Sequence, residues 1–116
     1  MNWTALTDIG QLADIKQKSH EHPVILFKHS TSCSISSMAL SRLERGWDDS
    51  ALPKVEAYYL DLIAYRQIST AVADDFDIYH QSPQIMIIVN GEVIYDDSHM
   101  GISFSSLKKT LAERVN

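Results

Sequence analysis

The chain has 116 residues, of which 45% are apolar and 22% charged, and its formal net charge at pH 7 is −5. This length predicts one globular domain over residues 1–116, and the scattered charges argue against nucleic acid or a membrane surface as a partner. No stretch approaches the roughly 20 apolar residues that a bilayer crossing needs, and no secretory signal is recognisable.

Cysteine usage indicates the cellular compartment. Cys33 is the single cysteine of the sequence, so no disulfide can form within the chain. Free thiols persist best in a reducing compartment. We therefore expect a cytoplasmic protein.

The predicted elements begin with a helix, with Thr7 or Asp8 as its N-cap. Apolar residues then recur at helical spacing, namely Leu6, Ile9, Leu12, Ala13 and Ile15. Residues 24–29 are apolar at nearly every position, which predicts a strand covered on both faces. A second helix follows Cys33 and ends near Gly46. Its apolar positions are Ile35, Met38, Ala39, Leu43 and Trp47.

In the second half of the chain, residues 55–62 predict a strand, because β-branched and aromatic side chains dominate there. Residues 67–76 predict a helix with Ile68, Ala71, Val72 and Phe76 on its buried side. Asn90-Gly91 separates two β-rich runs, 84–89 and 92–95, which indicates a tight hairpin. Ser103 or Ser105 would cap a last helix that carries Phe104, Leu107, Leu111 and Val115.

The predicted order is therefore α-β-α-β-α-β-β-α. Alternating strands and helices in the first half imply parallel crossovers, and the hairpin adds an antiparallel edge. We predict an α/β thioredoxin-like fold, with a central mixed four-stranded sheet and helices on both faces.

The chemistry centres on Cys33, which follows the strand 24–29 and a short polar loop. A sulfur at the first turn of a helix faces unpaired backbone N–H groups and the positive end of the helix dipole, both of which favour the thiolate. Ser36 stands where a Cys-x-x-Cys oxidoreductase carries its second cysteine. It could donate a hydrogen bond to the thiolate, or it could be an ordinary first-turn serine. In either case no second thiol can resolve a mixed disulfide. The bland alternative is an inert buried cysteine, but the serines and threonine around Cys33 argue against an apolar setting.

Three segments together resemble the bacilliredoxin-like monothiol family of the bacillithiol system. They are His29-Ser30-Thr31-Ser32-Cys33-Ser34-Ile35-Ser36, His80-Gln81-Ser82-Pro83-Gln84 and Ser98-His99. The family pattern at the first segment is Thr-Cys-Pro-Ile-Ser, so Ser34 replaces a proline that would stiffen the helix start. The resemblance implies that the Ser82–Pro83 bond is cis and faces the sulfur, where the Ser82 backbone can hold the cysteinyl part of a substrate.

The site assignment follows from the motif and the resemblance. We assign catalytic roles to Cys33 and Ser36. The expected substrate-binding residues are Ser34, Ile35, Ser82, Pro83 and His99. His29, His80 and His99 could tune the thiol or bind a substrate carboxylate, or they could be loop histidines of mixed use. No pair of residues has a metal-ligand spacing, so we expect no metal.

These assignments predict a thiol–disulfide oxidoreductase. The protein would exchange a low-molecular-weight thiol with protein mixed disulfides, and the resemblance implies bacillithiol as that thiol. Its partners would be S-thiolated client proteins and the small thiol, which acts as co-substrate, with no bound cofactor. The alternative is a non-catalytic binding module that uses the groove beside Pro83, with Cys33 as a redox sensor. A metal chaperone is a third class.

Overall fold

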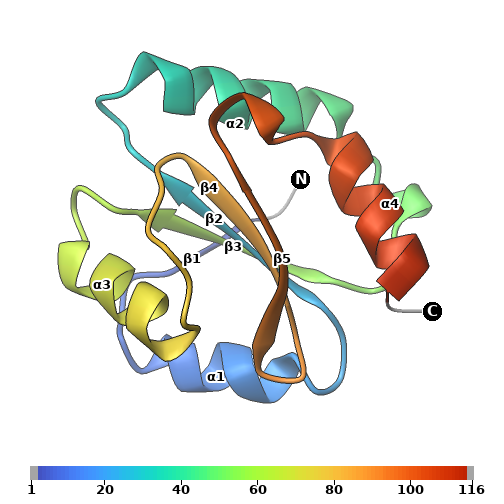
Figure 1. The fold of residues 1–116 in the computed structure, drawn as a ribbon, viewed down its shortest axis with the longest axis horizontal. Coiled ribbons are helices and arrows are strands. Elements are labelled where there is room, and N and C mark those ends of the chain that lie inside the picture. The colour runs from blue at the N-terminus through green and yellow to red at the C-terminus, as the bar shows by residue number, and fades with distance from the viewer. Residues whose placement is uncertain (1–2, 115–116) are drawn as a thin grey trace.

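Five strands form one mixed sheet in the order β1-β3-β2-β4-β5 in a computed structural model that describes residues 3–114 (Figure 1). The elements in chain order are β1 (Trp3–Ala5), α1 (Gln11–Lys18), β2 (Val24–His29), α2 (Ser34–Gly46), the 3-10 helix η1 (Asp49–Ala51), β3 (Glu56–Asp61), α3 (Arg66–Asp75), β4 (Gln84–Val89), β5 (Glu92–Ser98), the 3-10 helix η2 (His99–Gly101) and α4 (Phe104–Arg114). Within the described residues, no helix is both long and apolar enough to cross a bilayer.

Helices cover both faces of the sheet, as predicted. Helices α1 and α3 lie on one face and α2 and α4 on the other (Figure 1). Each layer has its own apolar core. One contains Leu12 of α1 and Val72 of α3, and the other contains Leu43 of α2 and Leu107 of α4. Strand β2 lies between these cores, and all six of its residues are buried.

The start of the chain differs from the prediction, because it opens with the short strand β1 and not with a helix. β1 pairs in parallel with β3, which makes the sheet five-stranded instead of four-stranded. The N–H of Leu6 continues this pairing by donating to the carbonyl of Tyr59. A three-residue strand gives almost no alternation signal, and its partner lies more than 50 residues away along the chain.

Helix α1 begins at Gln11, and neither Thr7 nor Asp8 caps it. The Asp8 carboxylate instead accepts the N–H of Gly10. The Gln11 amide oxygen accepts the N–H groups of Thr7 and Asp8. These side chains stabilise the turn before the helix, so residues that resemble a cap stand several positions before its first turn.

The hairpin between β4 and β5 is confirmed. Asn90 and Gly91 have φ values of 53° and 77°, and the need for positive φ at both turn residues explains the Asn-Gly pair. Strand β5 extends to Ser98, beyond the predicted end at residue 95. At α4, the Ser103 hydroxyl accepts the N–H of Ser106, so Ser103 is the cap. The predicted apolar position Val115 lies outside the described residues.

The predicted helix α2 is confirmed to its end at Gly46, but two of its apolar positions face outward. Ala39 and Leu43 are buried, whereas Ile35 and Met38 are 48% and 63% exposed. Helix α3 has the expected buried residues Ile68 and Val72 and ends at Asp75. Large apolar side chains are thus exposed at the start of α2, close to Cys33 in the sequence.

Candidate active site

The candidate site lies at the carboxyl end of β2, where three connecting segments meet. β2 and β4 are antiparallel, and Lys28 pairs with Gln84. In that register Pro83 comes next to His29, at the edge from which the chain leaves β2 toward α2. Backbone pairing also links η2 to this edge, because the N–H of His99 donates to the carbonyl of Pro83 (3.2 Å). The fold thus gathers the three sequence segments that carry the family resemblance.

Cys33 occupies the N-cap position of α2, as the motif predicts. Its backbone is extended, with φ −106° and ψ 120°, and its thiol makes no capping hydrogen bond. The Cys33 N–H donates to the carbonyl of Ser30 (3.1 Å), which closes the loop before the helix. The sulfur belongs to a partly exposed residue and forms no disulfide. The N-cap position places the sulfur at the end of α2 where the first backbone N–H groups of a helix have no partner within the helix.

Ser36 lies three residues further on and is fully buried. Its hydroxyl accepts the Ser30 N–H (3.0 Å) and lies 2.6 Å from Nδ1 of His29. Ser36 is therefore more than a first-turn serine on the surface, because it ties the loop 30–33 to the end of β2. Its role as a hydrogen-bond donor to the Cys33 thiolate stays a prediction.

His29 is the buried member of this group. The sequence indicated a histidine at a strand end, but not that it would be only 5% exposed. Its ring packs against the rings of Tyr59 and Phe27, with centroids 5.6 and 6.1 Å away. Burial lowers the pKa of His29, and the negative charges of Asp61 and Glu44 oppose part of that shift. The imidazole is therefore neutral at pH 7.

The loop before β4 carries the predicted substrate-binding pair Ser82 and Pro83. The Ser82–Pro83 peptide bond is cis. Ser82 keeps a buried hydroxyl oxygen for which the described residues supply no hydrogen-bond partner. Gln84 braces this loop, since its amide nitrogen donates to the Tyr79 carbonyl and its amide oxygen accepts the Gln81 N–H. The Pro83 junction is thus held firmly, with a polar group available beside it.

The other predicted binding residues are accessible. Ser34 and His99 are exposed, and Ile35 is half-exposed at the first turn of α2. His99 has a φ of 52°, which turns the chain sharply after β5. His80 serves a different purpose from the one expected of a loop histidine. Its Nδ1 accepts a hydrogen bond from the ammonium of Lys28 (2.6 Å), a lysine that is completely buried in β2.

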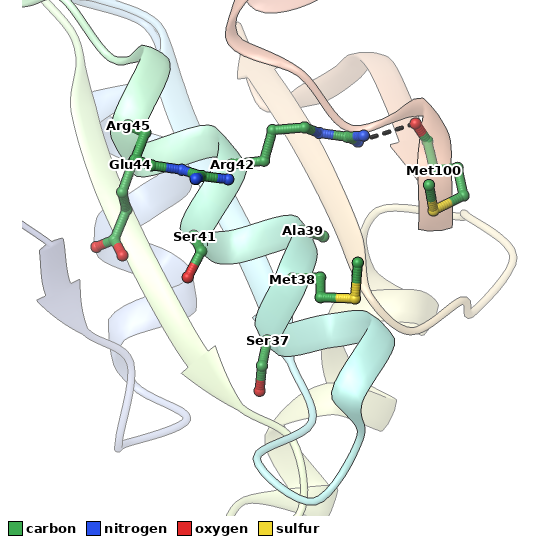
Figure 2. Close-up of a pocket in the computed structure, with 8 residues that line it drawn as sticks. All are labelled: Ser37, Met38, Ala39, Ser41, Arg42, Glu44, Arg45 and Met100. Atoms are coloured by element: carbon green, nitrogen blue, oxygen red, sulfur yellow. Dashed lines mark hydrogen bonds between the residues drawn. The ribbon is translucent and has the colours of Figure 1, made fainter.

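An apolar groove next to the site was not predicted. Met38 of α2 and Met100 of η2 are 63% and 68% exposed. They line an open groove of about 590 Å³, together with polar residues of α2 that include Arg42 and Arg45 (Figure 2). The Arg42 guanidinium donates to the carbonyls of Met100 and Ile102 and so fixes η2 against α2. The spacing of apolar residues in the sequence put Met38 on the buried side of its helix. The residues around Met38 carry no signal that η2 leaves this face of α2 open.

Residues 4–107 match the model of the monothiol bacilliredoxin family BrxC. The chain belongs to the monothiol bacilliredoxin family. Membership agrees with the resemblance drawn from the three sequence segments. It establishes a thiol redox function for a chain whose single cysteine is Cys33.

Solved structures place this bacilliredoxin-family chain in the thioredoxin fold. One neighbour of 30% identity is a thioredoxin-fold protein whose description suggests an oxidoreductase. The match covers 90% of this chain and 89% of the neighbour's chain, with a TM-score of 0.75. The thioredoxin of Malassezia sympodialis is 18% identical to this chain. The match covers 99% of this chain and 92% of the thioredoxin, and its TM-score is also 0.75. The thioredoxin of Trypanosoma brucei brucei is 13% identical to this chain. The match covers 98% of this chain and 91% of the thioredoxin, with the same TM-score. These last two show the fold alone.

Metal binding finds no support in the part of the chain that the structure describes. Among residues 3–114, no three or more His, Cys, Asp or Glu side chains are grouped so as to hold an ion. His29 and His80, which the sequence left open, are occupied by Ser36 and Lys28.

Proposed function

We propose that the protein removes a low-molecular-weight thiol from protein mixed disulfides, with Cys33 as the attacking nucleophile and bacillithiol as the thiol. The observation that carries the proposal is the position of Cys33, a partly exposed residue with a free thiol at the N-cap of α2, in the loop that follows the end of β2 where Pro83 lies next to His29. The cytoplasm is the compartment we propose, because the mechanism requires Cys33 to be returned to the reduced state.

The reaction consists of two exchange steps. The Cys33 thiolate attacks the small-thiol sulfur of the mixed disulfide, so a Cys33–small-thiol disulfide forms and the client sulfur leaves as a thiolate that takes up a proton. A second small thiol, as its thiolate, then attacks the small-thiol sulfur on Cys33. This regenerates the Cys33 thiolate and yields the disulfide of the small thiol. A separate protein dithiol could supply the same two electrons. Ser36 cannot take part as a resolving thiol.

The residues around Cys33 have separate roles in this proposal. The Ser82 backbone next to Pro83 would pair with the cysteinyl part of the client, as a strand edge does. Ser34 and Ile35 would contact the substrate at the helix start. His99 is exposed and would interact with a carboxylate of the small thiol. Ser36, which contacts His29 and Ser30, would hold the loop that carries Cys33 in place.

The experiment uses one client protein with a single cysteine, prepared as the bacillithiol mixed disulfide and as the glutathione mixed disulfide. Wild-type protein should release the client thiol from the bacillithiol form faster than from the glutathione form, and Cys33→Ser should be inactive on both. Equal rates on the two substrates would remove bacillithiol from the proposal. Release that survives Cys33→Ser would remove the exchange mechanism.

A second measurement separates the exchange protein from the binding module. A reactive Cys33 should be alkylated readily at about pH 6–7, whereas an ordinary thiol requires a pH near about 8.5. Slow labelling below that pH, together with an absence of release, would favour the module that binds partners beside Pro83.

A further inference from the structure

A chain of hydrogen bonds leads from a buried histidine to the nucleophile. Nδ1 of His29 contacts Ser36 Oγ, Ser36 Oγ accepts the Ser30 N–H, and the Ser30 carbonyl accepts the Cys33 N–H. The proposed function uses Cys33 and Ser36 but assigns nothing to His29. Its burial is notable, because a buried polar ring is retained at the end of a strand that is otherwise nearly all apolar.

The hydrogen-bonding capacity of Ser36 limits what its hydroxyl can do. A hydroxyl has one proton to donate and two lone pairs to accept with. The Ser30 N–H uses one lone pair. The contact with Nδ1 then has two forms. Either Ser36 donates its proton to a bare Nδ1, or Nδ1–H donates to Ser36 and the hydroxyl proton remains free.

The position of Ser36 decides where a free proton would go. Cys33 is the N-cap of α2 and Ser36 is its third residue. These are the two positions of a capping box, in which the side chain of the third helical residue reaches back toward the N-cap residue. A thiolate at Cys33 is an acceptor without a capping partner from its own helix. In the structure the Ser36 hydroxyl contacts His29 and Ser30 and not the Cys33 thiol, so a hydroxyl proton that His29 leaves free is available to turn toward a thiolate at Cys33.

We propose that His29 is a positioning residue that carries its proton on Nδ1, donates it to Ser36, and so leaves the Ser36 hydroxyl free to stabilise the Cys33 thiolate. His29 would act as a neutral dipole and not as a cation, which agrees with the effect of burial on its ring. The titratable groups that act on it are Tyr59 and Asp61 of β3 and Glu44 of α2. The inference rests on the proposed function, because it concerns the same nucleophile.

The decisive experiment is a double-mutant cycle on the ionisation of Cys33, followed by thiolate absorbance and by alkylation rate against pH. His29→Leu and Ser36→Ala should each lower the ionisation constant of Cys33 by about tenfold or more, as expected when a hydrogen bond to a charged group is lost. In the double variant His29→Leu should add nothing to Ser36→Ala. His29→Asn has a side-chain N–H near the position of Nδ1 and should recover most of the loss. Additive effects, or no effect of His29→Leu, would overturn the proposal.

Nitrogen NMR of the wild-type imidazole gives a test that does not depend on any variant folding. With Cys33 ionised, the proton should reside on Nδ1, and a proton on Nε2 would overturn the proposal. The ionisation of Cys33 is measured without any client protein. A failure of the role proposed for His29 can therefore be distinguished from a failure of the proposed exchange function. Client release with additive variant effects would reject the role of His29 alone. A coupled cycle without client release would reject the exchange function and leave the coupling standing.

Discussion

Lys28 allows a prediction whose size follows from the structure. Its side chain is fully buried in β2, and among residues 3–114 its ammonium has one hydrogen-bond partner, the neutral Nδ1 of His80 at 2.6 Å. Burial lowers the pKa of Lys28 from 10.5 to about 8. Burial and the Lys28 charge together also lower the pKa of His80, so this histidine is neutral at pH 7 and its Nδ1 can accept the bond.

The free energy at stake is about 3 kcal/mol, because one pKa unit corresponds to about 1.36 kcal/mol. The native pKa lies below the unfolded value, so the native state gives up this proton first as the pH rises. The contribution of Lys28 to stability is therefore least favourable below about pH 8 and improves up to about pH 10.5, where both states are neutral.

Lys28→Met keeps most of the side-chain volume and removes the ammonium. The loss of the bond to His80 costs about 1 kcal/mol, so the variant should be more stable than the wild type by about 2 kcal/mol at pH 7. This advantage should vanish, and the order should reverse slightly, as the pH approaches 10.5. Urea unfolding at several pH values, followed by the fluorescence of Trp3 and Trp47, measures the difference. A variant that is less stable at pH 7 by an amount independent of pH would refute the reasoning.

Two further predictions concern how η2 and the start of α4 contribute to stability. Gly101→Ala should destabilise the protein by about 1–2 kcal/mol, because its new Cβ would collide with the Asp97 carboxylate, which already accepts bonds from Tyr95 and Ser98. Gly46→Ala is the control, since its Cβ would meet the side chain of Phe104 at an ordinary 3.5 Å, and equal losses in thermal unfolding would exclude the collision. Ser103→Ala should lose about 1 kcal/mol with the cap of α4, whereas the exposed Ser105→Ala should change urea unfolding by less than about 0.5 kcal/mol. The reverse order would move the cap to Ser105.

The elements that could be predicted are those whose signals are local. The buried strand β2 is a continuous apolar run, and Asn90-Gly91 satisfies a backbone requirement that few other residues can meet. Strand β1 could not be predicted, because it is defined by its partner β3 and not by its own three residues. Because β1 was not predicted, the predicted first helix began too close to the start of the chain.

Within the site, the sequence was sufficient for Cys33 at the helix start and for the Pro83 loop, because each stands in a recognisable motif. It did not reveal what the histidines contact. His29 reaches Ser36 across a loop, and Lys28 reaches His80, which lies 52 positions away along the chain. Such contacts depend on side-chain rotamers and on the packing of separate elements, and no spacing rule contains that information. The exposure of Met38 has the same origin, since it depends on how η2 lies against α2.

Intact-mass spectrometry can show whether Cys33 itself takes up the small thiol. Reduced protein is mixed with a client that carries one bacillithiol on one cysteine, and both chains are weighed over time. The proposed reaction requires that this chain gains one attached small thiol on Cys33 as the client loses it, and that Cys33→Ser gains nothing. A client that loses its adduct while Cys33 stays unmodified at every time, or a wild-type chain and client that both keep their starting masses, would contradict it.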